Sequence, residues 1–228
     1  DQIIEILTVR GQMPRKQARE RAAELFSLVG LDRKRMDYYP HEFSGGMKQR
    51  AVIAAALALD PSVVIADEPV TALDVIVQHQ VLRELKSLQS RLGLAILMIT
   101  HDMAVIAQSC DEVLVMYAGK VVERGPVRRV LLSPAHPYTM GLTNAFPHLH
   151  RNQSELVSIE GYPPDLIAPP PGCRFAPRCP FAVEQCRAEA PTLVELATDH
   201  LAACHRLNDV DRLREQAREV STWRMETR

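Results

Sequence analysis

The chain has 228 residues, of which 46% are hydrophobic and 24% charged, as is ordinary for a globular protein. The charges of its 27 basic and 28 acidic residues nearly cancel. The composition therefore gives no sign of a basic surface that would bind nucleic acid or an anionic membrane. No apolar run approaches the roughly 20 residues of a membrane span and no signal peptide is recognisable, so we expect any membrane connection to pass through a protein partner.

Two helices are predicted at the start of the chain. Ile3, Ile4 and Leu7 have helical spacing, and a second helix begins at Pro14 and ends at Gly30. The opening segment has neither an N-cap nor an initiating methionine. We therefore expect the chain to be the interior of a longer protein or a truncated one.

A third helix is predicted to begin at Ser44-Gly45-Gly46 and to run through an alanine-rich segment to Leu59. Glycines let the backbone approach a phosphate closely, and the N–H groups at a helix start suit an anion. Ser44 adds a hydroxyl donor. Taken alone, a Ser-Gly-Gly tripeptide more often marks a plain turn.

Two apolar runs, 63–66 and 94–100, predict strands that are covered on both faces. The apolar spacing over 75–93 predicts a helix between them. This strand–helix–strand order indicates a parallel sheet and an α/β fold class. A hairpin is expected over 112–123, with its turn at Ala118-Gly119.

Polar residues follow each of the two strands, at the sheet edge where open α/β sheets bind their ligands. After the first strand, one carboxylate of Asp67-Glu68 can hold Mg²⁺ through water while the other polarises an attacking water. The alternative is a pair of solvated acids at a strand end. His101 follows the second strand and is placed for a phosphate or water contact, although a lone histidine is more often a satisfied structural residue.

Four segments in this order and spacing resemble the motifs of ABC ATPases. Phe43 to Arg50 resembles the signature motif and Val63 to Glu68 the Walker B strand. Ala72-Leu73-Asp74 resembles the D-loop, and His101 the switch histidine. The resemblance covers roughly residues 1–130 and implies a partial ABC-type P-loop ATPase domain, with a helical subdomain and a parallel sheet core.

The resemblance also implies roles for single residues. Asp67 would be the Mg²⁺ aspartate, Glu68 the general base and His101 the sensor of the γ-phosphate of ATP. The signature residues would contact ATP held by a partner subunit, and Asp74 would lie at the dimer seam. The implied nucleotide-binding residues are Ser44, Gly45, Gly46, Gln49, Asp67 and Asp74.

A P-loop of the form Gly-x-x-x-x-Gly-Lys-Ser/Thr does not occur in these 228 residues. In the family, this loop, the glutamine loop and the aromatic residue that stacks on adenine precede the position of Asp1. We therefore expect the isolated chain to have no ATPase activity. The alternative function is a non-catalytic interaction subunit, which donates its signature motif or docks through its C-terminal extension.

Composition changes after Gly125, where prolines become frequent, and we predict a loop-rich extension over 131–228. Residues 133–139, Ser-Pro-Ala-His-Pro-Tyr-Thr, resemble an element that follows the ATPase core in oligopeptide and dipeptide importers, and Met47 fits that group. This resemblance implies a second ABC ATPase subunit, two membrane permeases and an extracytoplasmic binding protein as partners. It also implies a peripheral location at the cytoplasmic face of the inner membrane, with peptide as the default substrate. A soluble ABC ATPase of DNA repair or translation is disfavoured.

Four cysteines of the extension are candidate metal ligands, because converging thiolates suit tetrahedral Zn²⁺ or a [4Fe–4S] cluster. Their spacing is wider than in a usual zinc site, and the resemblance to the importer extension implies the iron–sulfur cluster. His200 and His205 are backup ligands, and Cys110 is expected to be an ordinary buried residue. The alternative is a set of unligated thiols in a small core. The four cysteines are Cys173, Cys179, Cys186 and Cys204.

Overall fold

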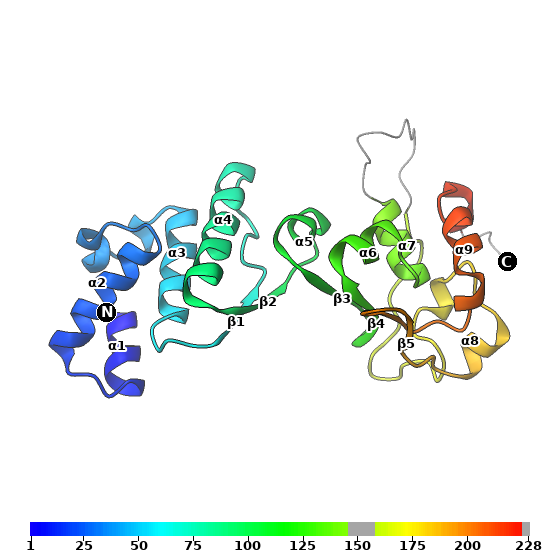
Figure 1. The fold of residues 1–228 in the computed structure, drawn as a ribbon, viewed down its shortest axis with the longest axis horizontal. Helices are drawn as coiled ribbons and strands as arrows, with labels where there is room; N and C mark the ends of the chain where they lie inside the picture. The colour runs from blue at the N-terminus through cyan, green and yellow to red at the C-terminus, as the bar shows by residue number, and fades with distance from the viewer. Residues whose placement is uncertain (146–157, 225–228) are drawn as a thin grey trace. The chain divides into compact units, whose positions relative to one another are not determined.

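A computed structural model gives the structure of the protein and describes residues 1–145 and 158–224. By its internal contacts the chain divides into two compact units, Asp1–Asp102 and Met103–Arg228 (Figure 1). The domain boundary expected near residue 130 separates the ATPase domain from its extension. The division into compact units does not test that boundary, which stays a prediction. None of the helices in the described ranges has both the length and the hydropathy needed to cross a membrane.

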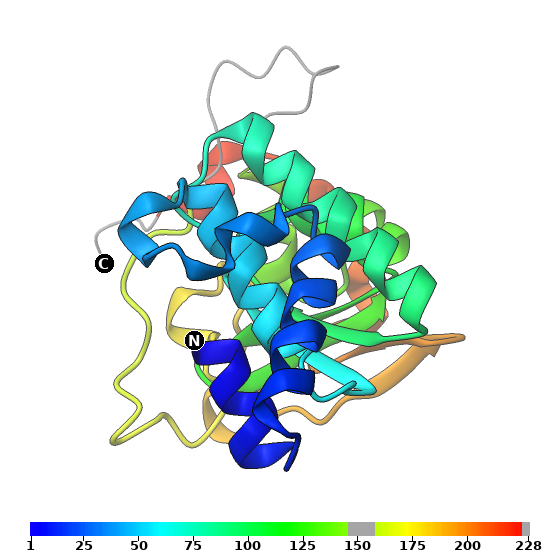
Figure 2. The same ribbon diagram turned by 90° about the vertical axis from the view of Figure 1, so that its left-hand side faces the viewer.

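The first unit is mainly helical, and its helices lie where the sequence predicts them. In Figures 1 and 2, α1, α2 and α3 (blue to cyan) lie beside one another and α4 packs on α3. The helix α3 ends before the predicted Leu59. The helical elements are α1 (Gln2–Glu5), the π-helical turn η1 (Ile6–Arg10), α2 (Arg15–Leu28), the 3-10 turns η2 (Arg33–Asp37) and η3 (Pro40–Glu42), α3 (Gly45–Ala56) and α4 (Val75–Leu92).

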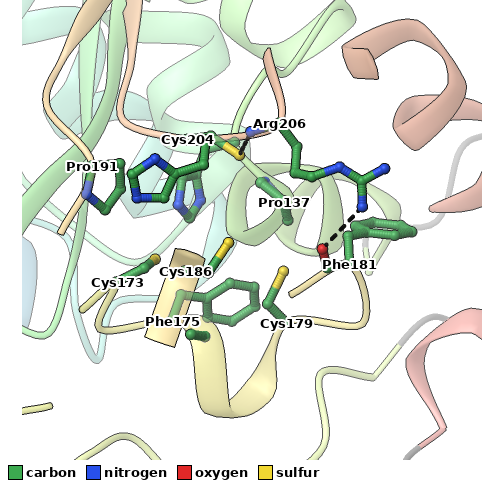
Figure 3. A pocket seen from close by; sticks show the side chains of 12 residues that line it. Pro137, Cys173, Phe175, Cys179, Phe181, Cys186, Pro191, Cys204 and Arg206 are labelled. Atoms are coloured by element: carbon green, nitrogen blue, oxygen red, sulfur yellow. Dashed lines mark hydrogen bonds between the residues drawn. The ribbon is translucent and has the colours of Figure 1, made fainter. Parts of the chain in front are cut away.

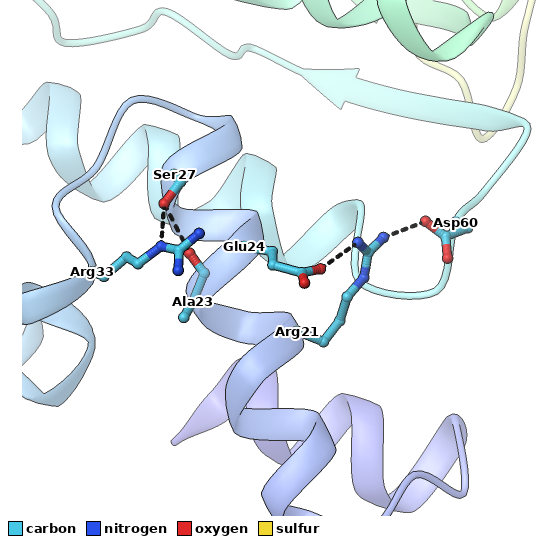
Figure 4. Close-up of polar contacts among 6 residues, drawn as sticks. All are labelled: Arg21, Ala23, Glu24, Ser27, Arg33 and Asp60. Carbon is cyan, nitrogen blue, oxygen red and sulfur yellow. Dashed lines mark hydrogen bonds and ion pairs between the residues drawn. The ribbon is translucent and has the colours of Figure 1, made fainter.

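Polar contacts join α2 to the segments that follow it in the chain (Figure 4). Arg21 donates to Glu24 Oε2 at 3.1 Å and to Asp60 Oδ1 at 2.6 Å, and Asp60 lies just ahead of the first strand. Arg33 donates to the Ser27 hydroxyl, which itself donates to the carbonyl of Ala23. These contacts are exposed, so they orient the chain more than they stabilise it.

The first unit holds a parallel pair of strands, β1 (Val63–Asp67) and β2 (Ala95–Ile99), with Asp67 in register with Ile99. We expected both faces to be covered, and that expectation is wrong for the described residues. One face carries exposed apolar side chains, although parallel strands are nearly always covered on both sides. These are Val63, Ile65, Leu97 and Ile99, which are 48–66% exposed.

The second unit is built on an antiparallel sheet of strand order β3-β4-β6-β5. The predicted hairpin is confirmed as β3 (Glu112–Tyr117) and β4 (Lys120–Pro126). Two strands from the loop-rich extension complete the sheet, β6 (His200–Ala202) beside β4 and β5 (Val194–Ala197) at the edge. The helices are α5 (Met103–Ser109), α6 (Val127–Leu132), α7 (Pro137–Asn144), α8 (Glu184–Ala188) and α9 (Val210–Gln216).

One face of the β3–β4 hairpin forms the core of the second unit. Side chains alternate along β3, so Val113, Val115 and Tyr117 are buried while Leu114 and Met116 are exposed. Aromatic rings from the extension close the core, with the rings of Tyr117 and Phe175 edge to face at 5.1 Å between centroids. The extension therefore packs directly on the hairpin.

A buried carboxylate, Glu123 on β4, joins three segments of this unit. Its Oε1 accepts from the N–H of Ala135 at 2.8 Å and lies 2.8 Å from Nε2 of His200 on β6. Its Oε2 accepts from the N–H of His136 at 2.9 Å. Glu123 is fully buried, and a buried carboxylate is tolerated only when its oxygens are satisfied in this way.

We expect Glu123→Ala to destabilise the second unit by about 3–5 kcal/mol, because each buried donor left without its acceptor costs roughly 1–3 kcal/mol. The substitution leaves two backbone N–H groups and His200 without their acceptor. Urea unfolding followed by the fluorescence of Trp223 measures the loss. The control is Glu112→Ala, because Glu112 pairs with Arg124 at the surface and should cost no more than about 1 kcal/mol. Equal effects of the two variants would contradict this account.

Candidate functional site

The residue that follows β1 has an unusual backbone. Glu68 has φ +47°, a left-handed conformation that is uncommon for a residue with a side chain. Its N–H donates to the carbonyl of Ile99 at the end of β2. This bond holds the strained residue beside β2, and strain of this kind is typical of functional sites.

Both carboxylate oxygens of Glu68 are engaged. Oε1 lies 2.7 Å from Nδ1 of His101, and Oε2 accepts from the Thr71 hydroxyl at 2.5 Å. The structure thus joins two residues that the sequence predicted at this edge and adds Thr71, which the sequence analysis missed. The available signal was a hydroxyl residue three positions after Glu68, where it can fold back in a turn.

These contacts shift the pKa values of Glu68 and His101. The hydrogen bond from Thr71, and then the one with His101, lower the pKa of Glu68. The contact with Glu68 raises the pKa of His101. The His101 side chain is 81% exposed, so solvent screens the pair strongly.

The other polar groups at this edge come from the turn after β2 and from the end of β1. Asp102 donates its N–H to the Thr100 hydroxyl, and its carboxylate accepts from Gln78 on α4 at 3.4 Å. These contacts, also missed from the sequence, orient the turn that carries His101. Asp67 is exposed at the end of β1, and its role as the Mg²⁺ aspartate stays a prediction.

The signature-like segment begins α3 as predicted. Ser44 is the N-cap residue and its hydroxyl accepts from the N–H of Met47 at 3.4 Å. A Cβ on Gly46 would lie 2.6 Å from Val77 Cγ1, so this glycine also permits close packing of α3 on α4. Gln49 lies half-buried within α3. The glycines therefore have a packing role whether or not a phosphate binds here.

Asp74 has a local role that the sequence analysis did not assign. It is the N-cap of α4, and its Oδ1 accepts from the N–H groups of Ile76 and Val77 at 3.1 and 3.0 Å. The neighbouring Val75 and Ile76 are exposed apolar residues. Its predicted place at a dimer seam stays a prediction.

The four cysteines of the extension line one small hollow in the second unit (Figure 3). Its other lining residues are mostly apolar, among them Phe175 and Phe181. Within the part of the chain that the structure describes, no three His, Cys, Asp or Glu side chains are grouped closely enough to hold one metal ion. The structure thus gathers the predicted thiols without forming a single-ion site.

The backup ligands do not take that role. His200 is not among the residues that line the hollow, because its ring is bonded to Glu123. His205 lines the hollow, but its Nε2 lies 2.9 Å from the carbonyl oxygen of Glu189. Both expectations were based on sequence proximity to Cys204, which does not decide where a ring points.

Burial favours the protonated form of three of the four thiols. It raises the pKa of Cys204 to about 11 and raises the pKa values of Cys173 and Cys179 above their ordinary range. A metal centre would have to displace these protons, because the thiolate is the ligand. Backbone N–H groups already point to sulfur here, since that of Arg206 donates to Cys204 Sγ at 3.4 Å.

Arginines next to the cysteines anchor the loops of the hollow to the hairpin. Arg174 donates to the carbonyl of Ala118 in the β3–β4 turn. Arg178 donates to the carbonyl of Ile159 at 2.7 Å and lies 3.2 Å from the hydroxyl of Tyr117. The cysteine loops are thus held by the same hairpin that forms the core, and the sequence signal was an arginine adjacent to Cys173 and another adjacent to Cys179.

Two sequence models of protein families match the chain. The one described as ABC transporter matches residues 1–71, and the one described as oligopeptide/dipeptide transporter, C-terminal region, matches residues 122–186. A structure from Clostridium perfringens, described as part of an ABC transporter complex, has a TM-score of 0.51 and 30% identity. It covers 57% of this chain and 51% of its own, and it shows that the fold here is like that of an ABC ATPase.

Curated relatives extend the similarity over most of the chain. A probable peptide ABC transporter ATP-binding protein of Sinorhizobium fredii is 48% identical over 212 residues, 92% of this chain and 63% of the relative. The oligopeptide transport ATP-binding protein of Salmonella typhimurium is 47% identical over 206 residues, 90% of this chain and 61% of the relative. The chain thus spans about three fifths of the length of these relatives.

We expect an NMR titration to give His101 a pKa above its ordinary value of about 6.5, and Glu68→Gln to return it toward that value. With His101 raised, the pair's stabilisation is full below pH about 6.5 and is lost as pH rises through the folded pKa. With Glu68 lowered, it is present above pH about 4.3 and is lost as pH falls through the folded pKa.

The matched control for this titration is Thr71→Val. It removes the hydroxyl from Glu68 but keeps the contact between Glu68 and His101. The pKa of His101 should therefore stay raised in this variant. An unchanged pKa in Glu68→Gln would show that the two side chains are not paired in solution.

Proposed function

The chain belongs to the family of ATP-binding proteins of ABC transporters, and from that premise we propose that it is part of the ATP-hydrolysing subunit of a peptide importer. Relatives that match nine tenths of the chain carry peptide or oligopeptide transport in their names, which supports peptide as the substrate class. In this role the subunit couples ATP hydrolysis to transport across the inner membrane.

The observation that carries this proposal is the edge formed by Glu68, Thr71 and His101. The carboxyl ends of two parallel strands converge there, which is where open α/β sheets bind ligands. Glu68 would orient the attacking water and receive its proton, and Asp67 would hold Mg²⁺. Bound Mg²⁺ supplies charge neutralisation for the phosphates. His101 would sense the γ-phosphate from its exposed position beside Glu68.

The hydrogen bonds of Glu68 support a specific order of events. With Thr71 and His101 both bonded to it, Glu68 has a lowered pKa and is a weaker base than a solvated glutamate. Its basicity rises when His101 moves from its Oε1 to a phosphate oxygen. His101 would in this way link the presence of the γ-phosphate to the proton-accepting strength of Glu68.

The start of α3 would serve ATP held by a second ABC ATPase subunit. Ser44 and the N–H groups of Gly45 and Gly46 provide donors for the γ-phosphate, because the first N–H groups of a helix have no partner within it. Gln49 would add a contact one turn further along α3. Asp74, which caps α4, would lie at the seam between the two subunits.

The exposed face of β1 and β2 supports the proposal that this fold is completed by further chain. That face carries apolar side chains of both strands, and parallel strands are nearly always covered on both sides. We infer that a segment bearing the P-loop covers it. The other proposed partners are two membrane permeases, with a binding protein acting from outside, and the location is the cytoplasmic face of the inner membrane.

The four cysteines of the 131–228 extension would hold a [4Fe–4S] cluster. All four line one hollow, and four thiols are the donor set that such clusters require. A single Zn²⁺ needs its sulfurs about 2.3 Å from one point, and the described thiols are not grouped that closely. A cluster with an iron for each cysteine accepts more widely spaced thiols. Bound, it would supply a redox-active and structural centre for the extension.

We expect the purified 228-residue chain to show no Mg-ATP turnover, because its sequence contains no P-loop. If the reading frame continues upstream into a P-loop, the extended product should hydrolyse ATP. Glu68→Gln should then lower its kcat by about 10²–10⁴-fold, the usual contribution of a positioned base. Phosphate release measures both.

The matched control is Glu112→Gln, which changes an exposed carboxylate on β3 and should leave kcat unchanged. Turnover by the 228-residue chain that Glu68→Gln abolishes would contradict the expected inactivity. A start codon immediately upstream would instead support the non-catalytic subunit, which only donates its signature motif or docks through its extension.

We expect the chain purified without oxygen to be brown and to contain about four irons and four sulfides per chain. The visible absorption spectrum and metal analysis test this. Cys179→Ser should abolish the colour, whereas Cys110→Ser, which changes a cysteine that does not line the hollow, should keep it. A colourless protein that contains zinc would replace the cluster by Zn²⁺.

A further inference from the structure

The histidine of the His-Pro-Tyr segment reaches the cysteine hollow. His136 is 2% exposed and is one of the residues that line the hollow together with the four cysteines. In the sequence this segment and the four cysteines are separate features. The structure brings the His136 ring and the four cysteines to the same hollow, where the ring can act on whatever the cysteines bind.

The backbone of His136 is fixed from one side. Its N–H and that of Ala135 each donate to an oxygen of the fully buried Glu123. His200 from β6 holds the same carboxylate in place at 2.8 Å. His136 therefore starts from a backbone position that the sheet itself determines.

The ring of His136 is fixed as well. Its Nδ1 accepts from the N–H of Tyr138 at 3.0 Å, which caps the start of α7, and the ring packs on Phe175 with centroids 5.8 Å apart. A nitrogen that accepts a hydrogen bond carries no proton, so the ring is neutral and its proton is on Nε2. Burial agrees with this assignment, since it lowers the pKa of His136 to about 3.

The Nε2–H group is left as an available donor at the hollow. Among the described residues no hydrogen bond engages it, whereas the other polar side chains of the lining are occupied. His205 is bonded to the carbonyl of Glu189, and Arg206 is bonded to Asp209 and to the carbonyl of Phe181. Because the ring lines the hollow, this N–H group can donate to an acceptor that binds there.

We propose that Nε2–H of His136 donates a hydrogen bond to a sulfur atom of the metal centre held by the four cysteines and raises its reduction potential; this rests on the proposed iron–sulfur cluster. Reduction adds negative charge to the sulfurs, and a donor fixed beside them stabilises the reduced state more than the oxidised one. His136 is a positioning residue and not a ligand, because ligation through Nε2 would require the ring proton to move to Nδ1. That move would break the bond to Tyr138.

The test is a redox titration of the full 228-residue chain with its cluster, followed by electron paramagnetic resonance. His136→Asn keeps a side-chain acceptor for the Tyr138 N–H but is too short to present a donor to the hollow. We expect a lower midpoint potential with iron and sulfide content unchanged. The control is His205→Asn. The ring nitrogen Nε2 of His205 is already bonded to the carbonyl of Glu189, so this substitution should leave the midpoint potential unchanged.

A second measurement uses the unaltered chain and does not depend on any variant folding. Electron–nuclear double resonance of the reduced protein in H₂O and D₂O should detect an exchangeable proton coupled to the cluster. The matched His136→Asn spectrum, where that variant is stable, should lack it. Absence of any coupled exchangeable proton in the unaltered chain would overturn the proposal.

The outcomes separate this proposal from the one on which it rests. A chain that binds zinc or no metal overturns both the cluster and the donor role of His136. A chain with an intact cluster whose potential is the same in His136→Asn overturns the donor role alone. Loss of iron in His136→Asn while the variant keeps its circular dichroism spectrum would make His136 a ligand, and would also overturn the donor role.

Discussion

A fully buried carboxylate organises the second unit of this protein. Glu123 accepts from the backbone at Ala135 and His136 and lies against His200, so one side chain on β4 fixes the start of α7 and the position of β6. A carboxyl group is stable in the interior only because all of these hydrogen-bond partners are present at once. The same contacts fix one wall of the cysteine-lined hollow, because His136 forms part of that wall.

In the first unit the corresponding constraint is a strained backbone. Glu68 leaves β1 with a positive φ and is held by a bond to the last residue of β2, which directs its carboxylate to His101 and Thr71. The result is a hydrogen-bonded edge in which the neighbours of the Glu68 carboxylate lower its pKa. A site of this kind can be switched by a ligand that competes for one of those neighbours.

Local patterns made much of the fold predictable. The helices α2 and α4, the hairpin of β3 and β4, and the capping positions of Ser44 and Asp74 follow from spacing and chemistry within a few residues. The strand β6 was missed because its pairing partner in the hairpin, β4, lies more than seventy residues away, and β5 was missed with it because β5 pairs with β6. The apolar composition of β1 and β2 predicted cover on both faces, but composition does not say which chain provides the cover.

By itself, the sequence determined the family and the order of its motifs, because residue types at fixed spacing are a property of the chain alone. Only the tertiary structure decided the partners of single side chains: Thr71 on Glu68, Glu123 on His200 and the His136 ring at the cysteine hollow. The reason is that a side chain's direction depends on packing between segments distant in sequence. His200, which sequence proximity offered as a metal ligand, shows the difference most clearly, since its ring is bonded to Glu123.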